Sequence, residues 1–225
     1  MGLFLMQKQF LMISDNLKLV NSRIESIQSD QDVELIAVSK TRSVLEIQEA
    51  FNAGQIHFGE NYLQESLEKV NYFKDSGLVW HFIGPIQSNK TALISENFDW
   101  VHSVDRFKIA KRLSDQRNPN LGKLNILVQV NIDKEKTKSG VFIEKVDEIV
   151  SEIISLPYIC LRGFMCIPKA ENSSDSFSKM KDLISNYPSL DTLSMGMSAD
   201  LEVAIKNGAN LVRVGTDIFG QRSYN

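Results

Sequence analysis

The sequence contains few cysteines, no long apolar run and no linker rich in proline, glycine or serine. Its two cysteines, Cys160 and Cys166, are too few for a cysteine-rich zinc site, and their spacing matches no redox motif. Both lie in or beside apolar runs, so we expect buried structural thiols. No stretch approaches the ~18 apolar residues of a membrane span, and the first 13 residues lack the basic start of a signal peptide. These absences favour a cytoplasmic protein without membrane contacts.

A strong charge of either sign is also missing. The 25 Lys and Arg residues and 28 Asp and Glu residues leave a net charge of -3. Nucleic-acid partners usually require a basic patch or stripe, so we expect no such partner. The 225 residues, 43% of them hydrophobic, suit one globular domain of the size of an α/β barrel. Because no linker divides it, the chain is expected to form a single domain over residues 1–225, led by a helical segment over 1–30.

Apolar runs alternate with amphipathic stretches along the chain. The runs predict eight strands, over residues 33–39, 55–59, 79–83, 100–104, 124–132, 159–167, 192–195 and 211–214. The stretches predict helices over residues 11–27, 43–54, 61–74, 89–97, 106–117, 143–155, 176–186 and 199–207, the second with Ser43 and Glu46 as its capping box. Eight such alternations predict an α/β fold with a parallel sheet closed into a (β/α)8 TIM barrel, with an extra N-terminal helix.

Lys40 directly follows the first predicted strand, and it is the most informative single residue. In a barrel of this kind the functional site lies at the C-terminal ends of the strands. A lysine at that place is partly desolvated, which lowers its pKa and leaves free amine for Schiff-base chemistry. On position alone, an ordinary solvated lysine remains the alternative.

Polar residues follow the other strands as well, and the strand count predicts that they surround one mouth. They are Glu60, Asn61, Gln87, Asn89, Lys90, Asp105, Arg106, Asn131, Ser198 and Thr216. Two of the loops suit a phosphate group, because barrels often bind phosphate after strands seven and eight. Ser198 can cap a helix that begins near Ala199 and can face an anion, and Gly215 permits close backbone approach. Alternatively, Ser198 only caps the helix and Gly215 only forms a turn, without any phosphate contact.

Arg213 lies inside the apolar eighth strand. Buried arginines are rare unless they are paired with a ligand or an acid. A structural salt bridge or a position on the outside of the barrel would also explain it.

Five ordered blocks of sequence resemble the pyridoxal phosphate homeostasis family. They are AVSKT (37–41), FGENYLQE (58–65), WHFIGPIQSNK (80–90), LSMGMS (193–198) and VRVGT (212–216), the last followed by FG (219–220). The block over 80–90 is the most distinctive. Arg42 and Ser43 depart from the pattern, since the family often has Lys-Pro there. The difference affects the start of a helix.

The resemblance implies the fold of the alanine racemase barrel domain and a cofactor, pyridoxal 5'-phosphate (PLP). It implies that Lys40 carries PLP as an internal aldimine and that Arg213 faces the pyridine nitrogen. It further implies that the phosphate is held by Ser198, Gly215 and Thr216, with Asn61 beside the cofactor. The role of His81, in the middle of the third strand, is left open between the site and a hydrogen-bonded core position.

The same resemblance favours a PLP carrier over an enzyme. An arginine at the pyridine nitrogen keeps that nitrogen unprotonated and makes the ring a poor electron sink. In the related racemases a second, all-β domain supplies an acid–base group, and the end of this sequence at Asn225 predicts that no such domain follows. We therefore expect reversible PLP binding and a contribution to vitamin B6 and amino-acid/keto-acid homeostasis, with no catalytic residues and no metal. Candidate partners are PLP-dependent apo-enzymes, and the expected state is a monomer. The alternatives are a low-activity PLP-dependent racemase or lyase, and a Schiff-base aldolase-like barrel without cofactor.

Overall fold

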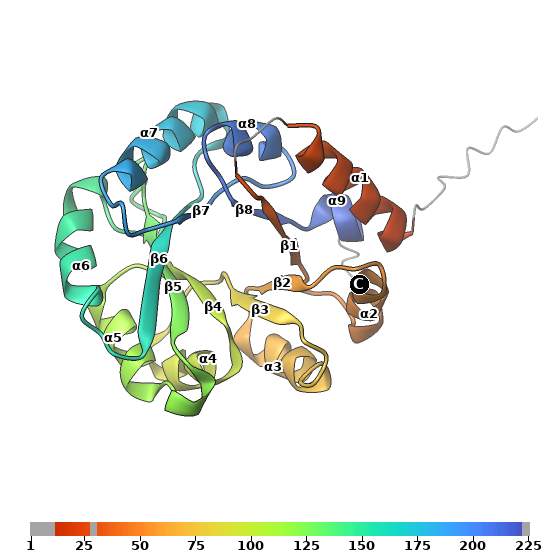
Figure 1. Ribbon diagram of the computed structural model, residues 1–225, viewed down its shortest axis with the longest axis horizontal. Coiled ribbons are helices and arrows are strands. Elements are labelled where there is room, and N and C mark those ends of the chain that lie inside the picture. Colours follow the sequence, from red (N-terminus) through yellow and green to blue (C-terminus); the bar gives the residue numbers. More distant parts are fainter. Residues whose placement is uncertain (1–11, 28–30, 222–225) are drawn as a thin grey trace, which may run out of the picture.

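Eight parallel strands close into a barrel (Figure 1). The computed structural model describes residues 12–27 and 31–221, so parts of the predicted leading segment (1–11 and 28–30) and the tail (222–225) lie outside the described residues. The strands follow each other in chain order, and β8 pairs with β1 to close the ring. They are β1 (Glu34–Val38), β2 (His57–Glu60), β3 (Val79–Phe82), β4 (Trp100–Val104), β5 (Leu124–Val130), β6 (Ile159–Cys166), β7 (Thr192–Ser194) and β8 (Leu211–Val214). The predicted eight-stranded barrel is confirmed.

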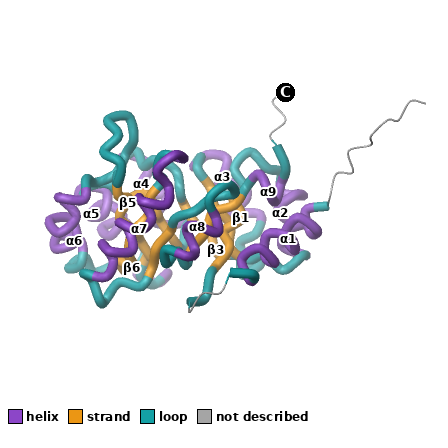
Figure 2. The backbone as a smooth tube through the Cα atoms, turned by 90° about the horizontal axis from the view of Figure 1, so that it is seen from above, coloured by secondary structure: helices purple, strands orange, loops and turns teal. Residues whose placement is uncertain are grey.

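The helices lie outside the strands and surround them (Figure 2). They are α1 (Ile13–Glu25), α2 (Val44–Asn52), α3 (Leu63–Tyr72), α4 (Thr91–Asn97), α5 (Phe107–Gln116), α6 (Val146–Ile153), α7 (Ser173–Ser185), α8 (Leu201–Lys206) and α9 (Thr216–Phe219). Short 3-10 turns are η1 (Ser88–Lys90), η2 (Pro119–Leu121), η3 (Ile143–Lys145) and η4 (Ala170–Asn172). The extra N-terminal helix is α1, which packs against α2 and α9. No helix among residues 12–27 and 31–221 is both long and apolar enough to cross a membrane.

Several predicted helix boundaries are shifted by two or three residues. The helices expected at 89 and 143 begin with the tighter turns η1 and η3, and α-helical geometry follows only after them. The helix expected at 176 begins at Ser173, because residues that were assigned to a loop join it. The capping box of α2 is confirmed: the Ser43 hydroxyl accepts from the Glu46 amide, and the Ser43 amide donates to Glu46 Oε2 at 2.7 Å.

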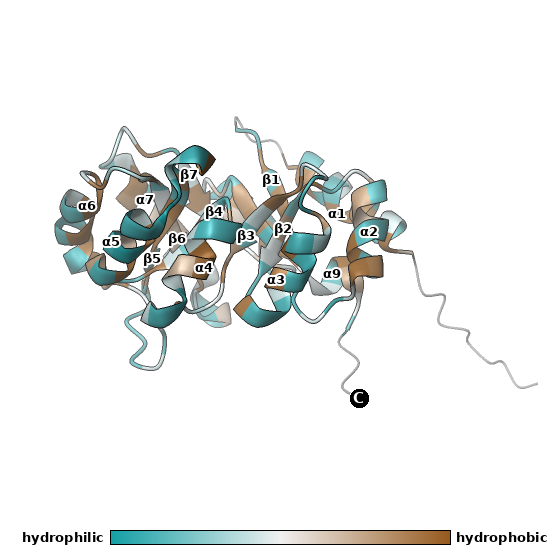
Figure 3. Cartoon of the chain, turned by 90° about the horizontal axis from the view of Figure 1, so that it is seen from below, coloured by the Kyte–Doolittle hydropathy of each residue, from teal (hydrophilic) through white to brown (hydrophobic). Residues whose placement is uncertain are grey.

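Side chains on the two faces of the closed sheet build two separate apolar cores. The outward side chains, such as Phe58, Trp80 and Val212, join the large core beneath the helices. The helices themselves carry both hydrophobic and hydrophilic residues (Figure 3). A small core fills part of the barrel interior and consists of Ile36, Leu127, Met165 and Leu211, with Trp100 packed against it. Several other inward positions are polar, among them His81, His102 and Arg213.

The two cysteines are free thiols, as expected, but only one is buried. Burial raises the pKa of Cys166 to about 12, which leaves it protonated and unreactive at neutral pH. Cys160 is half-buried, at an alternate position of β6 between the buried Ile159 and Leu161.

Candidate functional site

A cavity of about 320 Å³ opens at the C-terminal ends of β1, β2, β7 and β8. All six residues that the sequence predicts for the site line it: Lys40, Asn61, Ser198, Arg213, Gly215 and Thr216. The rest of the lining is Val38, Arg42, Ile83, Ile167, Met197 and Ala199. Arg42, which the sequence associated only with a helix start, therefore belongs to the cavity wall as well.

The prediction that all strand-end polar residues share this mouth is only partly correct. Asn131 lines a neighbouring cavity, which Asn61 also borders. Asp105 and Arg106 line a different cavity beside α6. Gln87, Asn89 and Lys90 do not line the main cavity, because the chain turns into η1 and α4 and carries them away from the barrel axis.

Lys40 lies two residues beyond β1, half-buried, with its side chain in the cavity wall. The partial burial expected from the sequence is confirmed. The lowered pKa of its amine remains a prediction.

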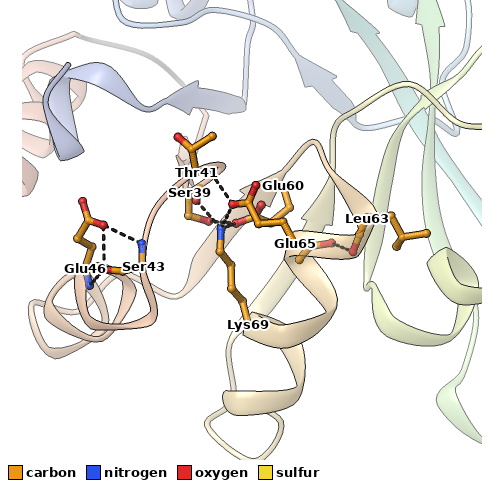
Figure 4. Close-up of polar contacts among 9 residues, drawn as sticks. Ser39, Thr41, Ser43, Glu46, Glu60, Leu63, Glu65 and Lys69 are labelled. Carbon is orange, nitrogen blue, oxygen red and sulfur yellow. Dashed lines mark hydrogen bonds and ion pairs between the residues drawn. The ribbon is translucent and has the colours of Figure 1, made fainter. Parts of the chain in front are cut away.

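A buried lysine holds the backbone on the N-terminal side of Lys40 (Figure 4). Lys69, which projects from α3, donates to the Ser39 carbonyl and to Glu60 Oε1, both at 2.8 Å. The Ser39 hydroxyl donates to the same carboxylate oxygen at 2.7 Å. Glu60 is fully buried, and burial raises its pKa while the Lys69 charge opposes that rise.

The C-terminal side of Lys40 is held by the same group. The Thr41 amide donates to Glu65 Oε1, and Lys69 donates to that oxygen as well. Thr41 has φ 64°, a left-handed conformation that non-glycine residues seldom adopt. Together, Lys69, Glu60 and Glu65 form a clamp that fixes the chain before and after Lys40. Sequence reasoning missed this clamp, because Glu65 and Lys69 have the i,i+4 spacing of an ordinary surface pair.

The two loops after β7 and β8 meet at one side of the cavity, but Ser198 is not the helix cap that was predicted. Helix α8 begins at Leu201, and Ser198 lies in the turn before it. The Asp200 side chain accepts from the Met197 amide and stabilises that turn instead. Thr216 is the first residue of α9, directly after Gly215.

Helix α1 ties these two loops together. The Arg23 guanidinium donates to the Ser198 carbonyl at 3.0 Å and to Glu202 at 2.8 Å, on the α8 side. It also donates to Asp217 of α9 at 2.6 Å. The leading helix therefore fixes the relative positions of Ser198 and Thr216.

Arg213 points into the barrel and reaches the cavity floor. Its strand neighbours Val212 and Val214 belong to the core beneath the helices, so the arginine faces the interior. Its guanidinium donates to Ser194 Oγ at 2.5 Å and to the Cys166 carbonyl at 2.9 Å. Within the described residues it forms no ion pair with an acid. The exterior position and the salt bridge considered from the sequence are therefore both excluded.

Asn61 carries an unsatisfied oxygen. Its Oδ1 is buried and has no hydrogen-bond partner among the described residues, although the side chain borders both cavities. A buried polar atom without a partner is costly, so its position at a cavity wall suggests a ligand contact.

The fold and this constellation define a class: single barrels built like the N-terminal domain of alanine racemase. The profile of the family described as alanine racemase, N-terminal domain, matches residues 12–223. An alanine racemase of Clostridium difficile shares the fold, with a TM-score of 0.71 at 15% identity over 94% of this chain and 61% of that one.

Nearer relatives identify the family within this class. A pyridoxal phosphate homeostasis protein of Pseudomonas aeruginosa is 48% identical over 222 residues, which cover 94% of this chain and 96% of the relative. PipY of Synechococcus elongatus, solved with PLP bound, is 33% identical with a TM-score of 0.81, and the match covers 92% of this chain and all of that one. The chain belongs to the pyridoxal phosphate homeostasis protein family.

Proposed function

We propose that this protein binds PLP reversibly through a covalent bond to the Lys40 amine and contributes to vitamin B6 and amino-acid/keto-acid homeostasis. The observation that carries the proposal is the convergence of six residues, from four separate strand ends, on one cavity. The name shared by the curated relatives and the PLP bound to PipY support it.

The residues around the cavity fit each part of this cofactor. PLP, when bound, supplies an aldehyde that bonds to amines and a ring that withdraws electrons. Lys40 offers the amine, and the hydroxyls of Ser198 and Thr216 beside Gly215 offer donors for the phosphate. Arg213 would donate to the ring nitrogen from the cavity floor. The unpartnered Asn61 Oδ1 supports the presence of a ligand at this wall.

The cavity wall favours holding the cofactor over catalytic turnover. Racemisation requires acid–base groups on two faces of the reacting carbon. Among the described residues of the wall, Lys40 is the one charged side chain that can give up its proton, because Arg42 and Arg213 keep theirs. No carboxylate, histidine or tyrosine of the described residues lines the cavity. This composition supports a carrier.

A transfer assay tests the proposal against the enzyme alternative. PLP-loaded protein is mixed with the apo-form of a PLP-dependent enzyme, and the regained activity is followed. In parallel, amino acids incubated with the loaded protein are analysed for inversion of chirality. We expect activity to return and chirality to be preserved. Lys40→Ala should abolish transfer, whereas Lys108→Ala, at an exposed position, should not. Lys40-dependent racemisation would show an enzyme instead.

We further propose that the chain works as a single domain and as a monomer. We expect it to deliver PLP to PLP-dependent apo-enzymes in the cytoplasm.

A further inference from the structure

All three histidines of the sequence lie in one hydrogen-bonded row inside the barrel. His57 Nδ1 lies 3.0 Å from His81 Nε2, and His81 Nδ1 lies 2.9 Å from His102 Nε2. They come from consecutive strands, β2, β3 and β4. His81 and His102 are fully buried. Their strand neighbours Phe58, Trp80, Phe82 and Val101 belong to the outer core, so the imidazoles face the barrel interior.

The row continues to the floor of the cavity at one end. His102 Nδ1 lies 2.8 Å from Ser194 Oγ, and the same oxygen accepts a hydrogen bond from Arg213. At the other end, His57 Nε2 lies 3.2 Å from Glu34 Oε2. Glu34 begins β1, whereas Lys40 follows the end of that strand, so the row crosses the barrel from its N-terminal end to the cavity.

The two ends of the row determine its direction. A guanidinium can only donate hydrogen bonds, and a carboxylate can only accept them. Ser194 Oγ accepts from Arg213, so its own proton is available for His102 Nδ1. A neutral imidazole has one donor and one acceptor nitrogen. His102 then donates from Nε2 to His81, His81 donates from Nε2 to His57, and His57 donates from Nε2 to Glu34. Each of the four contacts between Ser194 and Glu34 then contains one proton, with one donor and one acceptor.

The opposite direction is unfavourable at both ends. It would place the lone pair of His57 Nε2 against the Glu34 carboxylate and would leave the Ser194 proton without an acceptor in the row. A one-way row requires neutral imidazoles, which burial favours. Burial lowers the pKa of His102 well below its ordinary value, and the Arg213 charge lowers it further. Burial also lowers the pKa of His81, with smaller contributions from the two neighbouring histidines.

We propose that His57, His81, His102 and Ser194 are positioning residues that hold the Arg213 guanidinium in one orientation at the cavity floor through a one-way row of hydrogen bonds. Each neutral histidine carries its proton on Nε2. Ser194 keeps a lone pair aimed at Arg213, because its proton is engaged by His102. This fixes which N–H groups of Arg213 remain free to face the ring-binding part of the cavity. That last consequence rests on the proposed function, whereas the protonation pattern does not.

Nitrogen-15 NMR of the imidazole rings tests the pattern in the protein without cofactor. The two ring nitrogens of a neutral histidine have distinct chemical shifts, so each tautomer is identified directly. We expect the Nε2–H form at His57, His81 and His102 near neutral pH. A dominant Nδ1–H form, or an even mixture, at His81 or His102 would overturn the proposal.

Substitution of Ser194 tests the coupling to the cavity. With Ser194→Ala, Arg213 loses one of its two acceptors and keeps the Cys166 carbonyl. We expect PLP affinity to fall by about tenfold or more, as for the loss of a hydrogen bond to a charged group. The absorbance spectrum of bound PLP should also change. Ser194→Thr, which keeps the hydroxyl, should retain both properties. Ser95→Ala removes another buried hydroxyl, in α4, and should behave like the native protein.

The outcomes separate this proposal from the proposed function. If Ser194→Ala and Ser95→Ala bind PLP with the same affinity and spectrum, the positioning role is wrong. If the native protein binds no PLP, the proposed function fails, and the NMR result alone decides whether the row has its predicted direction. If Ser194→Ala does not fold, Ser194→Thr and the NMR experiment remain decisive.

Discussion

At the scale of single residues, the lysine that matters besides Lys40 is Lys69. Its ammonium contacts the Ser39 carbonyl, Glu60 and Glu65, and it is only 4% exposed. A buried charge that loses its partner is strongly destabilising, since desolvation is then uncompensated. The clamp thus links the stability of the barrel to the backbone conformation around Lys40.

Replacing Lys69 should reveal this link. We expect Lys69→Met to lower the free energy of unfolding by about 3 kcal/mol or more, because Glu60 would be left buried without its cation. The double variant Lys69→Met/Glu60→Gln should recover part of the loss. Lys111→Met breaks an exposed i,i+4 pair with Asp115 and should change stability by less than about 1 kcal/mol. Urea unfolding measures the stability of all three variants. Equal losses of stability in Lys69→Met and Lys111→Met would show that the buried Lys69 contacts do not stabilise the fold.

At the scale of elements, the cavity depends on how the loops after β2 and β3 fit together. Gly84 follows β3, and a Cβ atom at that position would lie 2.1 Å from the Asn61 carbonyl oxygen. No other residue type can occupy the position without moving the backbone that carries Asn61. The loops after β7 and β8 are held in a similar way by Arg23 of α1, which joins the turn before α8 to α9.

Gly84→Ala is therefore expected to damage the site itself. Overpacking typically destabilises by about 1–3 kcal/mol, and the displaced Asn61 should weaken PLP binding at the same time. Gly54 offers a matched control: its φ of 97° makes alanine unfavourable, yet nothing lies within 4 Å of the added Cβ. Gly54→Ala should lose stability and keep its PLP affinity, as measured by urea unfolding and cofactor titration. An unchanged affinity in Gly84→Ala would contradict this account of the loop.

At the scale of the whole molecule, the barrel shows what sequence reasoning can and cannot reach. The alternation of strands and helices predicted the closed sheet, because it follows from local pattern and topology. Position after a strand indicated Lys40, Asn61 and Thr216, whereas the family resemblance was needed to single out all six cavity residues, since Arg213 lies within β8. The Lys69 clamp and the histidine row did not follow. Ser194 and His102 are 92 residues apart, and their contact exists only after the ring has closed. Ser198 was misplaced as a cap because the turn before α8 is held by Asp200, which local propensity does not distinguish from a first helical residue.

The buried histidines should also make the stability of the molecule depend on pH. Burial lowers the pKa of His81 and His102, so the folded state keeps them neutral while the unfolded chain binds protons below about pH 6.5. The unfolded state then binds more protons, and stability falls as the pH decreases, by up to about 1.4 kcal/mol per pH unit for each histidine. Glu60, whose pKa is raised by burial, opposes this with at most one proton.

Urea unfolding between about pH 7.5 and pH 5.5 measures this slope. A variant with His81→Gln and His102→Gln should have a smaller slope than the native protein, whatever its absolute stability. Equal slopes in the two proteins would show that the imidazoles are not kept neutral by the fold.

We propose above all that Lys40 is the residue that bonds PLP, and locating the bond tests this most directly. The purified protein is incubated with PLP, reduced with borohydride to make the bond permanent, digested and examined by mass spectrometry. We predict one modified lysine per chain, in the peptide that contains Lys40, and no corresponding modification in Lys40→Ala. Stoichiometric modification at Lys69, Lys138 or a surface lysine instead, or none at all, would contradict the account.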